Sequence, residues 1–100
     1  MVELSHATIE RLKLLFESTT YERAAEILRE QCADNLPLWR AATPEGLERI
    51  RFAVLKLCKG EVQGLERAVH DAQVDWRDVL VAAGFAEDVH AHRKWSPSVG

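Results

Sequence analysis

The sequence TPEGLERIRFAVLKLCKG, residues 43–60, contains a helix start, an apolar arc and a helix end in that order. Thr43 precedes Pro44, and proline suits the first helical position because its missing N–H would have no partner there. Gly60 suits the left-handed residue that ends a helix. The stretch therefore predicts one amphipathic helix over residues 44–59, whose apolar arc is Leu47, Ile50, Ala53, Val54, Leu57 and Cys58.

Similar start signals divide the rest of the chain into helical segments. The signals are Ser5, Thr19 with Glu22, Gly60 before Glu61, and Asp75 with Asp78. We expect helices after Ser5 and over residues 20–33, 61–73 and 76–83, and a short last helix over residues 86–95. The pattern predicts an all-α fold, a compact bundle of five to six short helices. Residues 1–95 would form this single domain, and residues 96–100 a frayed tail.

The segment over residues 76–83 is nearly all apolar, so we expect it to be mostly buried. Trp76 would then be the costliest residue to truncate. Gly84 is expected to adopt a positive φ, which would end the helix and turn Phe85 back onto the core.

Composition limits the possible classes of protein. The 100 residues are 47% hydrophobic and 29% charged, as in a folded domain, and the formal charge of −3 disfavours general attraction to nucleic acid. Cys32 and Cys58 fall on apolar faces and are expected to be free and buried. Because no apolar stretch approaches membrane-spanning length and no signal-peptide centre is present, we expect a cytoplasmic protein with no membrane partner.

No arrangement of residues indicates catalysis. The five glycines are scattered and form no phosphate loop, and both cysteines have apolar neighbours that disfavour a thiolate. Glu87 and His90 have the spacing of di-iron helical bundles, but a partner motif is missing. We therefore expect no catalytic, cofactor-binding or metal-binding residues, no enzymatic activity and no small-molecule ligand.

Asp88 and His92 are four residues apart, so they are expected to form a surface pair that raises the affinity of His92 for a proton. The functional alternative is a pH-sensitive C-terminal lid.

Phe52 and Leu55 fall outside the apolar arc, among charged residues, so this helix is either central to the bundle or apolar on a second, exposed side. An exposed aromatic ringed by charge is typical of an interface anchor. Two tryptophans would contribute to the same interface if the connector and the last helix do not close over the core. They are Trp39, in the connector over residues 34–42, and Trp95. The interpretation is a non-enzymatic protein–protein interaction module, whose partner is another protein or a second copy in a homodimer.

The alternative is nucleic-acid binding through the C-terminal segment or through the basic residues of the helix over 44–59. Residues 77–93 loosely imitate a helix-turn-helix unit, although Glu87 and Asp88 stand where phosphate would lie. Arg49, Lys56 and Lys59 form the second basic option. The charge pattern makes nucleic acid the less favoured partner.

The run over residues 75–85, continuing to Ala91, His92 and Trp95, resembles a segment of small uncharacterised bacterial proteins. Residues 49–57 are similar to the same group, so the resemblance covers about the C-terminal half. It implies a bacterial cytoplasmic setting and no activity, cofactor or site residue.

Overall fold

The computed structural model describes residues 3–33, 44–88 and 90–97, and every regular element within these ranges is helical. The elements are α1 (His6–Leu15), α2 (Ser18–Gln31), α3 (Pro44–Cys58), α4 (Val62–Ala83) and the 3₁₀ helix η1 (Ala91–Lys94). The predicted all-α class is confirmed, whereas five to six helices were too many. Within the same ranges, no helix has the combination of length and apolar character that crossing a membrane requires.

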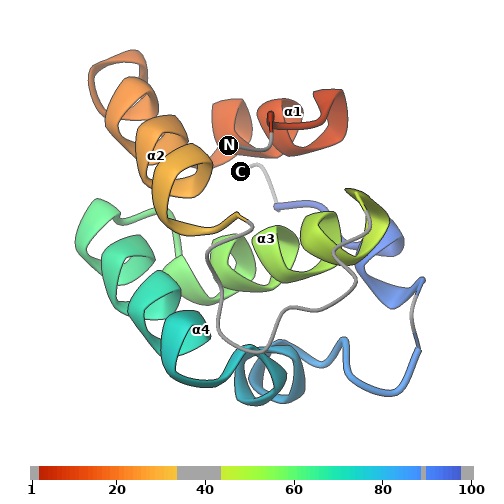
Figure 1. The fold of residues 1–100 in the computed structure, drawn as a ribbon. Helices are drawn as coiled ribbons and strands as arrows, with labels where there is room; N and C mark the ends of the chain where they lie inside the picture. The colour runs from red at the N-terminus through yellow and green to blue at the C-terminus, as the bar shows by residue number, and fades with distance from the viewer. Residues whose placement is uncertain (1–2, 34–43, 89, 98–100) are drawn as a thin grey trace.

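Helix α3 lies at the centre of the fold (Figure 1) and contacts α1, α4 and η1. Five consecutive residues of this helix, 51–55, are buried, so it has no polar face along this stretch. Phe52 is 1% exposed and Leu55 is fully buried. Of the two alternatives, the exposed second side with Phe52 and Leu55 as interface residues is therefore wrong, and α3 is central, because neighbouring elements of the same chain cover its second side.

The predicted helix boundaries are met in part. The Ser5 Oγ accepts a hydrogen bond from the Thr8 N–H at 3.2 Å and caps α1 as expected. Helix α2 begins at Ser18, two residues before the expected start, and its N-cap residue Glu17 makes no side-chain cap bond. Helix α3 begins at Pro44, and its end is followed by Gly60 at φ 75°.

The two helices expected over residues 61–73 and 76–83 are one element, α4, with a bend at Asp75. Asp75 has non-helical dihedrals, φ −157° and ψ 100°. Its Oδ1 accepts a hydrogen bond from the Arg77 N–H at 3.0 Å, so it caps the part that follows. We call residues 62–74 the first limb of α4 and residues 76–83 the second limb.

The end of α4 matches its prediction. Gly84 has φ 80° and ψ 21°, and its N–H reaches the carbonyl groups of Leu80 and Val81. Phe85 donates to the Leu80 carbonyl at 2.9 Å and is buried. The helix expected over residues 86–95 is shorter than predicted, since only Ala91–Lys94 forms a helix and it is of the 3₁₀ type.

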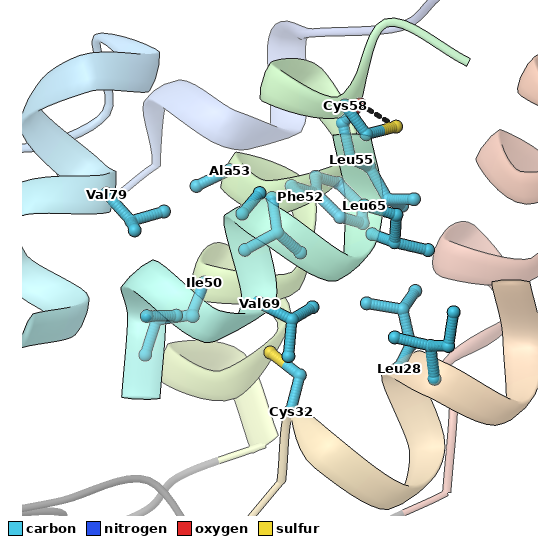
Figure 2. Packing of buried hydrophobic residues seen from close by; sticks show 14 of the residues in the cluster. Leu28, Cys32, Ile50, Phe52, Ala53, Leu55, Cys58, Leu65, Val69 and Val79 are labelled. Carbon is cyan, nitrogen blue, oxygen red and sulfur yellow. Dashed lines mark hydrogen bonds between the residues drawn. The ribbon is translucent and has the colours of Figure 1, made fainter. Parts of the chain in front are cut away.

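Buried polar groups join the N-terminal segment to the core. Arg51, 2% exposed, donates from Nε to the Cys32 carbonyl and from Nη1 to the Glu3 carbonyl, both at 2.9 Å. Cys32 and Cys58 are free and buried, as predicted, and Figure 2 shows them at opposite ends of the drawn cluster. Burial raises the pKa of Cys32 to about 12 and also raises the pKa of Cys58. Both thiols therefore act as small apolar core groups.

Candidate interaction groove

A groove of about 350 Å³ lies along the bend of α4. The bend allows both limbs to contribute to the groove, together with one residue near the end of α3. Figure 2 shows Val69 of the first limb and Val79 of the second on separate stretches of ribbon, with Ala53 of α3 between them. The residues lining the groove are Leu57 of α3 and His70, Asp71, Val74, Asp75, Asp78, Val79 and Ala82 of α4.

An exposed apolar side chain, that of Val74, lines this groove. Among the described residues, the exposed large hydrophobic side chains are Leu14, Val74 and Val81, at 49%, 70% and 65%. Two of these three belong to α4, one on each limb. The expectation that residues 76–83 are mostly buried is corrected here, because the second limb buries only Val79, Leu80 and Ala83.

The groove also carries negative charge. Asp71 and Asp78 are exposed, and neither forms an ion pair with any described residue. Asp75 differs, because its carboxylate is engaged by Arg77 in the cap and at 3.4 Å from the Arg77 Nε. Within the described ranges, no group of three or more His, Cys, Asp or Glu side chains is arranged to hold a metal ion. The groove thus combines an apolar surface with two carboxylates that are not paired with a cation in the described ranges.

The residues predicted to form an interface do not share a surface. Phe52 lies under the C-terminal segment, with ring centroids 5.2 Å from His92 and 6.1 Å from Trp95. The Arg11 guanidinium lies 4.2 Å from the Phe52 ring centroid on the α1 side. Leu55 is buried, and Trp95 is partly buried against the core. Trp39 lies outside the described residues.

His92 is buried and does not form the predicted surface pair. Its side chain has no exposed area, and neither ring nitrogen has a hydrogen-bond partner among the residues that the structure describes. The Asp88 Oδ1 instead accepts from the His90 N–H at 2.8 Å. Burial lowers the pKa of His92, the opposite of the direction expected from the sequence, and the charge of Glu48 opposes this effect in part.

Two basic residues of α3 donate hydrogen bonds to backbone carbonyl groups of the same chain. Arg49 donates from Nε to the Phe85 carbonyl at 3.0 Å, and Lys56 donates from Nζ to the Ala83 carbonyl at 2.8 Å. Arg93 pairs with Glu45. Because η1 has only four residues, the C-terminal segment does not form the recognition helix that the nucleic-acid alternative requires.

Comparisons of this chain with protein-family models, with curated proteins and with solved structures find no match. The fold defines the class as an all-α helical bundle. The resemblance to small bacterial proteins stays a prediction.

The sequence analysis missed the groove, although two signals for it are present. Asp75 marks a break in helical structure, and Val74 and Val81 stand on either side of it, with Asp78 between them. A break between two amphipathic stretches can leave apolar residues without cover on the second stretch. The apolar composition of residues 76–83 instead predicts a segment that is mostly buried.

Proposed function

We propose that this chain is a non-enzymatic interaction module that holds a cationic, apolar segment of a partner protein in the groove of α4. The proposal rests on one observation, the position of the 70% exposed Val74 in a groove that also contains the exposed carboxylates of Asp71 and Asp78, which form no ion pair with a described residue. Apolar contact supplies affinity, and the carboxylates select a partner that carries Lys or Arg. The cytoplasmic, bacterial setting predicted from the sequence belongs to the same proposal.

The apolar contact and the ion pairs can be compared by the binding free energy that each contributes. Full burial of a valine side chain is worth about 1.5 to 3 kcal/mol, so covering the exposed part of Val74 contributes roughly 1 to 2 kcal/mol. An exposed ion pair contributes only about 0.2 to 1 kcal/mol. Two such pairs contribute about 0.4 to 2 kcal/mol, so the apolar contact and the carboxylates give similar amounts of affinity, and the carboxylates also set specificity and the rate of association.

A second copy of the chain fits this groove less well than a cationic partner does. A two-fold homodimer uses the same surface on both subunits. Such a contact would bring Asp71 and Asp78 of one copy towards those of the other, and like charges across an interface oppose association. The net charge of −3 adds to this repulsion.

The test is an NMR titration of the ¹⁵N-labelled chain with a helical Lys/Leu peptide of about 18 residues, or about five turns. A Glu/Leu peptide with the same pattern is the control. We expect the Lys/Leu peptide to shift the amide signals of Val74, Asp78 and Ala82, and the Glu/Leu peptide to leave them unchanged. Equal shifts with both peptides, or shifts confined to other helices, would exclude the proposed partner chemistry.

Light scattering of the same sample distinguishes the self-association alternative. A monomer mass without peptide agrees with the proposal. A dimer mass, with the same amide signals changing as the chain is diluted, would replace the partner protein by a second copy.

A further inference from the structure

A C-terminal strap, residues 86–88 and 90–95, lies against α3 and covers Phe52. Its start is held by Arg49, which donates to the Ala86 carbonyl at 3.0 Å. Its end is held by Arg11 of α1, whose Nε donates to the Trp95 carbonyl at 3.1 Å. Between these points, the only regular element among the described residues is the four-residue η1. The strap is also attached by Arg93 and His90, which pair with Glu45, and by ring contacts of His92 and Trp95. These attachments do not join the four α-helices to one another, so the strap can leave while the helices keep their own contacts.

His92 is the most deeply buried part of this strap. Its ring meets Phe52 edge-on, with ring centroids 5.2 Å apart and planes at 71°. It meets Phe85 at 6.4 Å and 66° on another side. A neutral imidazole is tolerated there with unpartnered nitrogens. An imidazolium would add a charge and a second N–H donor between Phe52 and Phe85, where neither nitrogen has a hydrogen-bond partner among the described residues, and this is strongly unfavourable.

The charged groups around His92 do not compensate an imidazolium. From α3, Glu48 is engaged by the Ser5 hydroxyl at 2.6 Å, and Glu45 is shared by Arg93 and His90. The cations facing the pocket are more numerous than these two carboxylates. They are Arg49 of α3, Arg93 of η1, Arg11 of α1, which lies 4.2 Å from the Phe52 ring centroid, and Lys56 of α3, which lies 5.0 Å from the Phe85 ring centroid.

We infer that protonation of His92 releases the C-terminal strap from α3 while α1 to α4 stay folded, so that acid uncovers an apolar surface formed by Phe52 and Phe85. Opening of this kind is local, because the attachments of the strap are separate from the contacts among the four α-helices and the strap contains no long helix. The surface is distinct from the groove of α4, so the inference does not depend on the proposed function.

The direction of the pH effect follows from burial. The folded state lowers the pKa of His92, so the released strap binds a proton more readily than the docked strap. Docking is therefore fully favoured above the ordinary histidine pKa of about 6.5 and is weakened as pH falls below it. Between pH 7.5 and 5.5 the opening equilibrium can rise by up to about tenfold, one factor of ten for each pH unit below 6.5.

The experiment is hydrogen–deuterium exchange followed by mass spectrometry at pH 7.5 and 5.5, with correction for the intrinsic effect of pH on exchange. In the wild type we expect exchange of peptides from the strap to rise several-fold at pH 5.5, with peptides from α2 and the first limb of α4 unchanged. In His92→Phe the strap should exchange equally at both pH values. His70→Phe, which replaces an exposed histidine on the first limb of α4 outside the strap, should behave like the wild type.

Three results would overturn the inference. They are no change with pH in the wild type, the same pH response in His92→Phe, and a rise in exchange across all helices together, which would mean global unfolding. If His92→Phe does not fold by circular dichroism, His92→Gln replaces it, since glutamine also cannot take up a proton. Persistence of the pH response in the folded His92→Gln variant would contradict the inference equally.

Discussion

Gly64 lies so close to the carbonyl oxygen of Cys58 that a Cβ at this position would approach that oxygen to 2.6 Å. This contact joins the start of α4 to the end of α3, the two helices that share the most extensive contact among the described elements. The missing side chain of Gly64 therefore sets how closely the two helices approach. The position of the first limb of α4, and with it one wall of the groove, depends on this contact.

Gly64→Ala is expected to destabilise the fold. Alanine favours a helix over glycine by about 1 kcal/mol, but overpacking a close backbone contact costs about 1 to 3 kcal/mol, so the steric effect dominates. Urea denaturation measures the difference. Gln63→Ala, at an exposed neighbouring position, is the matched control and should change stability by less than about 0.5 kcal/mol. Stabilisation by Gly64→Ala would show that α3 and α4 can separate at no cost.

Gly84→Ala is expected to destabilise the chain by roughly 1 kcal/mol for a different reason. A Cβ at Gly84 meets no atom closer than 4.0 Å, but the residue has φ 80°, which a side chain disfavours. Gly84→Asn should recover part of this loss, because asparagine tolerates the left-handed conformation. Thermal denaturation of both variants checks the order, and an alanine variant more stable than the asparagine variant would contradict it.

Phe52→Ala is expected to cost about 3 to 5 kcal/mol, because it empties a fully packed aromatic site at the centre of the fold. Trp76→Ala should cost less, since Trp76 is only partly buried. This order reverses the sequence-based expectation that Trp76 is the costliest residue to truncate. Chemical denaturation of the two variants decides the matter, and equal stabilities would count against the buried position of Phe52.

Asp75→Ala is expected to lower stability by about 1 kcal/mol, because it removes the cap of the second limb of α4. The Asp75 carboxylate accepts the Arg77 N–H, whereas Asp71 makes no such bond. Asp71→Ala is therefore the control and should stay within about 0.5 kcal/mol of the wild type. The account of the bend fails if both variants unfold at the same urea concentration.

The sequence predicts the features that depend on neighbouring residues. Ser5 at the start of α1 and the turn at Gly84 with Phe85 follow from local hydrogen bonding and from glycine's access to positive φ. The break at Asp75 was also predicted, although as a gap between two helices rather than a bend within one. Each of these signals lies within a few residues of the structure that it specifies.

Features that depend on distant segments could not be predicted in this way. Phe52 is buried because α1 and the C-terminal strap cover α3, and helical periodicity does not show which faces of a central helix find partners. The burial of His92 could not be predicted for the same reason, because its spacing from Asp88 predicts a surface pair. Val81 is the opposite case, since an apolar residue of the second limb stays exposed where no element packs against it.

The most direct test of the proposed function is the dissociation constant of the Lys/Leu peptide, measured by isothermal titration calorimetry at low salt. Asp71→Lys/Asp78→Lys is compared with Glu22→Lys/Glu87→Lys, which makes the same change in net charge at exposed sites outside the groove. The account predicts roughly tenfold weaker binding for the groove variant, equivalent to about 1.4 kcal/mol, and binding close to wild type for the control. Equal weakening in both variants would contradict the account, because it would show that the peptide responds to net charge and not to the groove.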